Sequence, residues 1–175
     1  MINKIKYKKE LEPFITDACE ENKIFVSMAG DIPPNNYLVI KVDKYYNSLK
    51  LSHTPSSVDC LILLKCFDND FVIYLIELKN IKSPKGFKVD NIFSKFETTI
   101  KNFMSKRFKD IFLNKRYTIK DLHLFFVTNP YRKSEKFRRK ESTRMDFLLS
   151  IKPFRFRGKK YQLEHKLPSP MIRNC

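Results

Sequence analysis

The sequence predicts an α/β fold in which helices cover both faces of a central mixed β-sheet, a three-layer α/β/α arrangement. Three observations favour this fold class. The chain has 175 residues, of which 42% are hydrophobic, enough to bury a core without disulfides or structural metals. Its middle carries two adjoining apolar runs typical of a β-hairpin. A strand pattern, a long amphipathic helix pattern and another strand pattern then follow one another, as in a crossover between parallel strands.

The N-terminal part is predicted to contain one helix and two strands. Between about residues 8 and 22, apolar residues recur at helical spacing; they are Leu11, Phe14, Ile15, Ala18 and Cys19. Proline is tolerated only in the first turn of a helix, so Pro13 places the start of this helix near Leu11 or Glu12. Residues 23–28 and 37–42 read as strands, and residues 29–36, with one glycine and two prolines, read as a loop.

The strongest β signal lies between residues 57 and 79. The runs 57–67 (SVDCLILLKCF) and 71–79 (FVIYLIELK) are separated by Asp68-Asn69-Asp70, which is turn composition. Both runs are apolar on both faces, so we expect two central strands that are covered on each side.

The second half of the chain is predicted to alternate helix and strand. Asp90 or Asn91 caps a long helix, and residues 122–128 form a buried strand that is parallel to its predecessor. The apolar stripe of this helix comprises Ile92, Phe96, Ile100, Phe103 or Met104, and Ile111. Its opposite face carries Lys95, Lys101, Lys106, Arg107 and Lys109. Ser134 caps a further helix that extends to about Ile151, and residues 154–163 form a hairpin with Gly158 at the turn.

Charge is distributed unevenly along the chain. Residues 1–80 carry ten Lys or Arg and eleven Asp or Glu, whereas residues 81–175 carry twenty-five and eight. Such a basic half attracts polyanions, and nucleic acid is the partner that this pattern favours over an anionic membrane surface or a merely solvated face. Arg138, Arg139, Lys140, Arg155 and Arg157 are the candidate nucleic-acid-binding residues. Phenylalanines are interleaved with them, and core packing is the favoured role for these rings over base stacking.

The four cysteines and the N-terminus bear on the compartment. Cys19, Cys60, Cys66 and Cys175 show no CxxC spacing, and two of them lie inside apolar runs, where Cys acts as a small hydrophobe. No secretion signal and no apolar run of the ~20 residues needed to span a bilayer is visible. We therefore expect an intracellular protein with reduced thiols and no membrane association.

Three isolated charges converge on the predicted hairpin. Glu77 and Lys79 lie two residues apart on one strand, so their side chains point to the same face. If the turn is centred between residues 68 and 69, residue 59 faces residue 78, which brings Asp59 beside them. Two neighbouring carboxylates favour a hard cation, and Mg²⁺ or Mn²⁺ bound by Asp59 and Glu77, with the Leu78 carbonyl as a further ligand, satisfies them. The alternative is a structural salt bridge to Lys79.

Asp59, followed seventeen residues later by Glu77-Leu78-Lys79, resembles the D…(D/E)xK signature of the PD-(D/E)XK nuclease superfamily. The order of the elements over roughly residues 10–130 is also similar to the core of that superfamily, although Val58 stands where a proline is frequent. The resemblance implies a restriction-endonuclease-like fold, Mg²⁺-dependent phosphodiester hydrolysis, and Asp59, Glu77 and Lys79 as catalytic residues. It also implies an additional acid from the first helix, for which Glu10 is the first candidate and Glu12 the second.

The sequence therefore predicts one nuclease domain over residues 1–175, with a core at about 10–130 and a basic substrate-binding extension at about 131–175. The favoured function is that of a metal-dependent endonuclease acting on double-stranded DNA, a small restriction-type enzyme that works as a homodimer. A junction-resolving or mobile-element nuclease is an alternative with the same fold. A second alternative is a nucleic-acid-binding module without catalysis.

Overall fold

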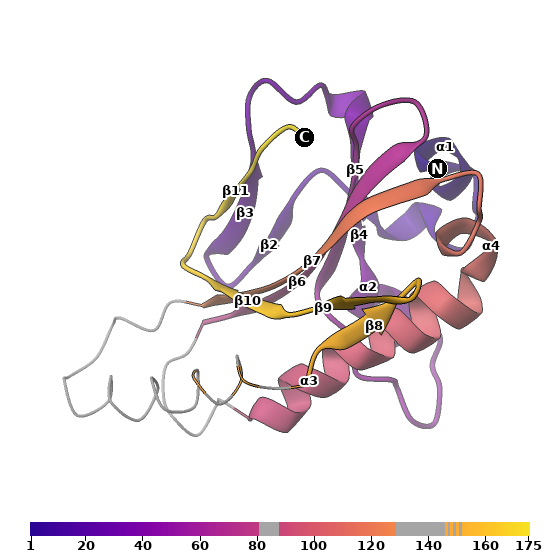
Figure 1. Ribbon diagram of the computed structural model, residues 1–175. Helices are drawn as coiled ribbons and strands as arrows, with labels where there is room; N and C mark the ends of the chain where they lie inside the picture. The colour runs from indigo at the N-terminus through magenta and orange to yellow at the C-terminus, as the bar shows by residue number, and fades with distance from the viewer. Residues whose placement is uncertain (81–87, 129–145, 147, 149, 151) are drawn as a thin grey trace.

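The computed structural model describes residues 1–80, 88–128, 146, 148, 150 and 152–175, and its centre is a six-stranded mixed sheet (Figure 1). The strand order is β1 (Ile15–Thr16), β4 (Tyr37–Lys41), β5 (Cys60–Lys65), β6 (Asp70–Lys79), β7 (Thr118–Thr128) and β10 (Leu163–Lys166). Neighbours from β1 to β6 pair antiparallel, whereas β6, β7 and β10 pair parallel. The predicted mixed sheet, the central hairpin and the parallel crossover are therefore confirmed.

Helical segments lie against one face of this sheet. They are α1 (Ile2–Lys6), η1 (Glu12–Phe14), α2 (Val42–Ser48), α3 (Val89–Thr98), the π-helical segment η4 (Thr99–Arg107) and α4 (Lys109–Phe112). Odd-numbered residues of β5 and β6, such as Leu61 and Leu75, pack in the same core cluster as Phe96 and Phe103 of the long helix. The predicted apolar stripe of that helix is buried as expected, but the helix begins at Val89, one residue before the predicted cap.

The opposite face is covered differently from the prediction. Even-numbered residues of β5 and β6, such as Ile62 and Tyr74, pack against a three-stranded sheet in the order β11-β3-β2. Its strands are β2 (Cys19–Glu21), β3 (Ile24–Met28) and β11 (Met171–Ile172). Within the described residues the layers are helices, large sheet and small sheet, so the expectation of helices on both faces is wrong for this part of the chain.

The helix expected between residues 8 and 22 is also wrong. Only the 3-10 turn η1 forms around Pro13, and the chain then extends into β1, where Ile15 and Thr16 pair with β4. A tight turn with positive φ at Asn22 and Lys23 joins β2 to β3. The β-branched residues of β1 gain sheet partners here, and this tertiary pairing overrides the helical spacing of the apolar residues.

Two further expectations concern the C-terminal quarter. The final hairpin is confirmed as β8 (Phe154–Phe156) and β9 (Lys159–Tyr161), and Arg157 and Gly158 both have positive φ at its turn, as type I′ turns require. The helix predicted from Ser134 falls largely outside the described residues. Where the chain is described, a helical hydrogen bond joins the Ser150 amide to the Asp146 carbonyl.

The prediction of four reduced cysteines is wrong in this structure. Cys19 of β2 is bonded to Cys60 of β5, and Cys66 is bonded to Cys175. The pairs are 41 and 109 residues apart in sequence, so only the packing of the small sheet and the C-terminus on the large sheet brings them together. Among the helices of the described residues, none has the length and apolar character needed to cross a membrane.

Candidate active site

Asp59 and Glu77 lie next to one another at one end of the central hairpin. Cys60 pairs with Ile76, so the ladder extrapolates to residue 59 opposite residue 77, one position from the predicted register. Both positions belong to the odd-numbered set that faces the helices. Asp59 is 5% exposed and Glu77 is 1% exposed. The predicted convergence of the two acids is therefore confirmed, and it takes place inside the protein beneath helix α3.

Lys95 of α3 is the cation that the structure places between them. Its Nζ lies 2.6 Å from Oε1 of Glu77 and 3.8 Å from Oδ1 of Asp59. The sequence interpretation put Lys95 on the outward face of the helix, and this was wrong. Lys95 directly precedes the buried Phe96, so its position at the border of the apolar stripe was the signal that could have placed it inward.

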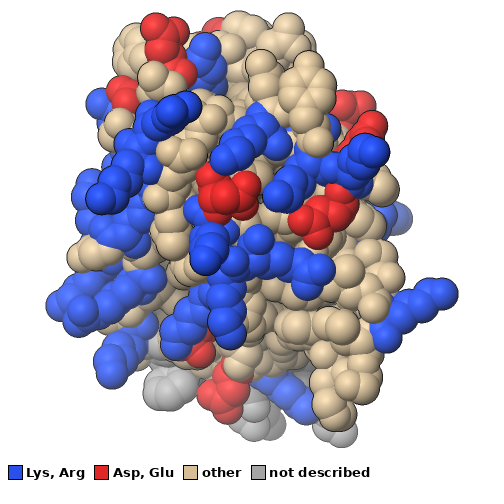
Figure 2. Space-filling view, turned by 90° about the vertical axis from the view of Figure 1, so that its right-hand side faces the viewer, with Lys and Arg blue, Asp and Glu red and all other residues tan. Residues whose placement is uncertain are grey.

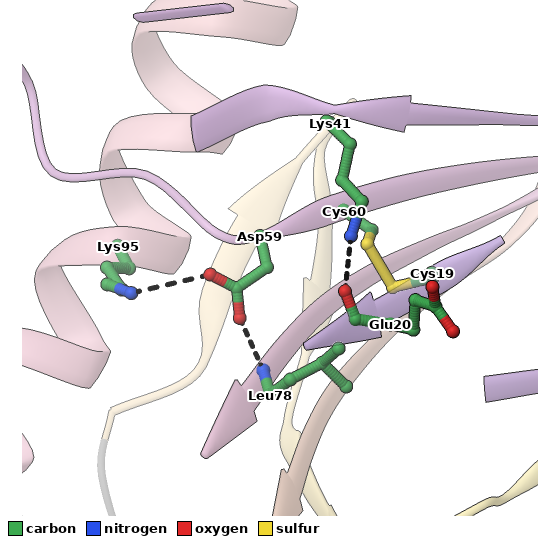
Figure 3. Close-up of a disulfide and its surroundings, with 7 residues drawn as sticks. All are labelled: Cys19, Glu20, Lys41, Asp59, Cys60, Leu78 and Lys95. Atoms are coloured by element: carbon green, nitrogen blue, oxygen red, sulfur yellow. Dashed lines mark hydrogen bonds and ion pairs between the residues drawn. A yellow bond between two sulfur atoms is a disulfide. The ribbon is translucent and has the colours of Figure 1, made fainter. Parts of the chain in front are cut away.

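Hydrogen bonds fix the orientation of Asp59 and of the adjoining helix. Oδ2 of Asp59 accepts a bond of 2.6 Å from the Leu78 amide (Figure 3). The Val58 amide donates to Oγ1 of Thr99, and the same hydroxyl donates to the Lys95 carbonyl. Thr99 is fully buried. This chain of contacts ties the start of β5 to the helical turn that carries Lys95, so the carboxylate and the ammonium are held in register by the fold.

The electrostatics of the pair are unusual for carboxyl groups. Burial raises the pKa of Asp59 to about 7, against the lowering effects of Lys95 and of the Leu78 amide. Burial, and then the charge of Asp59, raises the pKa of Glu77 to about 8. Burial lowers the pKa of Lys95, but the charges of Glu77 and Asp59 outweigh it and the pKa is raised overall. One ammonium thus faces two carboxyl groups, which favours retention of a proton by the pair near neutral pH.

Lys79 and Leu78 occupy the positions expected from the strand alternation. Lys79 is the last residue of β6 and is half-buried. Its charge lowers the pKa of Glu77, but less than the charge of Lys95 does. Leu78 is buried, and its amide is used by Asp59. The predicted use of the Leu78 carbonyl as a metal ligand stays a prediction.

The acid predicted from the N-terminal segment lies elsewhere. Glu10 accepts a hydrogen bond from the Tyr45 hydroxyl and lies 3.9 Å from Arg107. The other acids whose charges raise the pKa of Asp59 are Glu21 of β2 and Asp43 of α2. Oδ1 of Asp43 is buried, and no hydrogen-bond partner for it is found among the described residues. Sequence reasoning missed both acids, because neither α2 nor β2 was expected.

The carboxylate oxygens of Asp59 and Glu77 fit a hard divalent cation, provided that the ammonium of Lys95 moves away. Oε2 of Glu77 is buried and finds no hydrogen-bond partner within the described residues, so one carboxylate oxygen is left for a further ligand. Carboxylate oxygens are the donors that Mg²⁺ and Mn²⁺ prefer. No group of three or more His, Cys, Asp or Glu side chains arranged for a metal occurs in the part of the chain that the structure describes. A cation would therefore bind two protein carboxylates, and Lys95 would have to withdraw.

The predicted nucleic-acid-binding residues divide into three groups. Arg138, Arg139 and Lys140 lie outside the described residues. Arg155 is exposed on β8. The guanidinium of Arg157 instead donates to three carbonyls, those of Phe112 at 2.8 Å, Tyr117 at 2.7 Å and Asn114 at 2.9 Å. Arg157 thus fastens the loop between α4 and β7, whereas the exposed side chain of Arg155 has no hydrogen-bond or ion-pair partner among the described residues.

Basic side chains also gather at the end of the molecule where α1 and α4 lie (Figure 2). Lys4 and Lys8 lie 3.6 Å from the Asp110 carboxylate, although they come from the N-terminal half, whose net charge is −1. Exposed lysines and arginines of η4 and α4 lie close by in the sequence; they are Lys101, Lys106, Arg107 and Lys109. The basic surface is therefore built from both halves of the chain.

Comparisons of this chain with protein-family models, with curated proteins and with solved structures returned no match. The function is therefore inferred from the geometry and the electrostatics of the site.

Proposed function

We propose that this protein is a Mg²⁺- or Mn²⁺-dependent endonuclease that hydrolyses phosphodiester bonds in DNA, with the active site of a PD-(D/E)XK nuclease. The supporting observation is the buried pair of Asp59 and Glu77, which share one ammonium and leave Oε2 of Glu77 without a partner among the described residues. Two buried like charges are costly unless a cation balances them. A site with this imbalance gains more from a divalent ion than from a single lysine.

Asp59 and Glu77 would hold the metal, which supplies positive charge at a phosphate oxygen and acidifies water when bound. The Leu78 amide fixes the orientation of Asp59 through its 2.6 Å hydrogen bond. The free-energy cost of orienting this carboxylate for a metal is therefore small. Lys79, at the half-buried end of β6, would orient the attacking water or accept its proton. The restriction-endonuclease-like fold and the homodimer belong to the same proposal.

Lys95 has a separate role in this proposal. Its ammonium balances the two carboxylates while no divalent ion is bound, at 2.6 Å from Glu77 and 3.8 Å from Asp59. Its side chain is 23% exposed, so the flexible alkyl chain has a route toward solvent. A divalent ion held by Asp59 and Glu77 would displace the ammonium of Lys95, which would then be available to the phosphate of the substrate.

The experiment is a cleavage assay on supercoiled plasmid, linear duplex, single-stranded DNA and RNA, with Mg²⁺, Mn²⁺ or EDTA. We expect metal-dependent cleavage of DNA by the wild type. Asp59→Asn, Glu77→Gln and Lys79→Met should each slow it by roughly a hundredfold or more. Glu164→Gln, which removes a carboxylate on the other face of the sheet, is the matched control and should cut at the wild-type rate.

Two outcomes would count against the proposal. If the folded wild type cuts none of the four substrates with either metal, the nuclease function is wrong. If Lys79→Met cuts at the wild-type rate, the site is wrongly assigned even though the protein is a nuclease.

A nucleic-acid-binding module without catalysis is the second candidate, because Lys95 already contacts both carboxylates as a structural ion pair would. The same assay distinguishes the two functions when it is run beside a binding measurement. Metal-independent binding without cleavage is the result expected of a binding module. A junction-resolving or mobile-element role would appear as faster cleavage of branched than of linear duplexes.

A further inference from the structure

A second site lies on the far side of helix α3. A pocket of about 260 Å³ is formed by this helix, the first turn of η4 and the segment that leads into β8. Phe93 and Glu97 of α3 line it. Each of them is two residues from Lys95, so on a helix they project about 160° away from it. The pocket is therefore separated from the Asp59–Glu77 pair by the body of the helix and is no part of the proposed metal site.

The inner part of the pocket is aromatic and apolar. Phe93 stacks on Phe154 with ring centroids 4.8 Å apart and an interplanar angle of 29°. Phe154 is buried and also contacts Phe96, which keeps the pair fixed on the helix. Phe93 is half-buried, and Ile100 and Pro153 complete the apolar lining. A fixed ring with an accessible side is a stacking platform for a planar heterocycle.

The outer part of the pocket is basic. Lys101, Lys152 and Arg155 line it together with one acid, Glu97. Lys101 pairs with Glu97 at 2.7 Å, so this acid is already neutralised. Lys152 and Arg155 are exposed, and neither has an ion-pair partner among the described residues. Lys152 and Arg155 beside the aromatic lining suit a ligand that carries both an anionic group and a planar ring.

We propose that this pocket binds one unpaired nucleotide, with its phosphate at Lys152 and Arg155 and its base against Phe93. The volume of about 260 Å³ lies just below the range of about 300–1,000 Å³ that is typical of drug-sized ligands, which suits a single nucleotide. A base inside a duplex is stacked on both sides and must leave the stack to enter. The ligand is therefore a free nucleotide or a residue of a single strand. Only the link to a nucleic-acid substrate rests on the proposed function.

The test measures binding in EDTA, so that no cleavage contributes. A labelled single-stranded oligonucleotide and a duplex of the same sequence are titrated with protein, and the melting temperature is measured with adenosine monophosphate or with inorganic phosphate. Lys152→Ser combined with Arg155→Ser removes the basic part of the pocket. Lys159→Ser combined with Lys160→Ser on β9 removes the same charge from exposed positions outside the pocket lining and is the matched control.

We expect the wild type to bind the single strand more tightly than the duplex. Adenosine monophosphate should raise the melting temperature more than phosphate does. The pocket double variant should bind the single strand at least tenfold more weakly and lose the shift with the nucleotide, whereas the β9 control should lose about threefold at most. Phe93→Leu, which keeps an apolar side chain, should weaken single-strand binding several-fold without changing its salt dependence, since stacking carries no net charge.

Three results would overturn the assignment. Equal losses in the two double variants would show that only overall charge matters. Equal stabilisation by phosphate and by the nucleotide, with no effect of Phe93→Leu, would show an anion site that does not recognise a base. Equal affinity for single strand and duplex would exclude an unpaired ligand. These measurements differ from the cleavage assay, so a protein that cuts nothing can still support the pocket, and a nuclease can still fail here.

Discussion

Two clusters of charged residues on opposite faces of the large sheet differ in how well their charges balance. On the helix side, one ammonium faces the buried carboxyl groups of Asp59 and Glu77. On the other side, the carboxylate of Glu164 on β10 lies 2.8 Å from Nδ1 of His123 and 2.9 Å from Nζ of Lys166. The ring of His123 stacks on that of Tyr74. The second cluster is half-buried and contains two carboxylates, because Asp121 lies 3.5 Å from Nε2 of His123, together with two groups that can carry positive charge.

The pKa directions follow this difference. Burial raises the pKa of Glu164, but the hydrogen bonds from His123 and Lys166 outweigh it, and the pKa is lowered overall. The hydrogen bond to Glu164 raises the pKa of His123. In the Asp59–Glu77 pair both carboxyl groups are shifted upward instead. A balanced cluster stabilises the fold as it stands, whereas the unbalanced pair lowers its free energy by gaining a proton or a cation. This difference supports the proposal that the unbalanced pair is the functional site and that the balanced cluster is structural.

The largest effect is expected from the loss of Lys95. Lys95→Met leaves two buried carboxylates without a counter-charge, and near pH 9 the free energy of unfolding should fall by about 3 kcal/mol. Near pH 5.5 the loss should be smaller, because both carboxyl groups can hold protons. Lys166→Met removes an ammonium that is 35% exposed, and it should cost less than about 1 kcal/mol at either pH. Urea denaturation of both variants at the two pH values measures this difference, and equal losses would contradict the contrast.

The second effect concerns the pH dependence of the wild type. The folded pKa values of Asp59 and Glu77 lie above the ordinary values of 3.8 and 4.5. Between about pH 4 and pH 8 the folded state therefore holds protons that the unfolded state has released, so stability falls as the pH rises. We expect a decline on the order of 2 kcal/mol across this window. Glu77→Gln should flatten the decline, as measured by chemical denaturation across the window.

Glu164→Gln provides the matched comparison with the opposite sign. The folded pKa of Glu164 lies below its ordinary value, so its contribution is present above that value and disappears as the pH falls through the folded pKa. The contribution of His123, whose pKa is raised, disappears as the pH rises through its folded pKa. Glu164→Gln should thus reduce stability most near neutral pH. It should remove only the part of the decline above about pH 6.5 that His123 contributes, and leave the decline between about pH 4 and pH 6.5 in place. A flattened decline between about pH 4 and pH 6.5 in this variant would show that the dependence belongs to another group.

A third effect is stabilisation by metal. At pH 8, Mg²⁺ or Mn²⁺ should raise the melting temperature of the wild type, and a concentration of 10 to 100 times the dissociation constant corresponds to about 1.4–2.7 kcal/mol. Lys95→Met should show a larger rise at the same concentration, because no ammonium competes for the carboxylates. Asp59→Asn with Glu77→Gln should show none. An equal rise in that double variant would place the ion elsewhere, and a smaller rise in Lys95→Met would contradict the displacement of the lysine.

The parts of the fold that the sequence predicts correctly are those decided by local pattern. Two apolar runs around Asp68-Asn69-Asp70 are sufficient for the hairpin, because strand alternation and turn position fix which side chains share a face. The register error of one residue still leaves Asp59 beside Glu77. Gly158 likewise predicts the last turn, since a positive φ is required there.

The parts that the sequence misses depend on contacts between distant segments. The spacing of Leu11, Phe14 and Ile15 fits a helix, yet β1 forms because β4 offers a partner edge. Lys95 reads as a solvent-facing charge until the buried acids beneath α3 are known. The two disulfides depend on the small sheet and on the C-terminus, whose positions no local pattern reveals.

The smallest expected effects concern two arginines of the β8–β9 hairpin. The side chain of Arg157 is hydrogen-bonded within the protein, whereas that of Arg155 is exposed. The guanidinium of Arg157 donates hydrogen bonds to three carbonyls. Arg157→Lys keeps the charge but cannot make all three bonds, so it should lower the free energy of unfolding by about 1 kcal/mol. Arg155→Met should change stability by less than about 0.5 kcal/mol, because Arg155 is exposed on β8.

Binding should show the reverse order. If Arg155 meets a phosphate, Arg155→Met should reduce the log–log slope of affinity against salt by about one, whereas Arg157→Lys should leave the slope unchanged. Urea denaturation and a salt series with a labelled single strand, on the same two protein preparations, measure both quantities. If the slope changed only in the Arg157 variant, Arg157 would have to break its carbonyl hydrogen bonds on binding and contact the phosphate in place of Arg155.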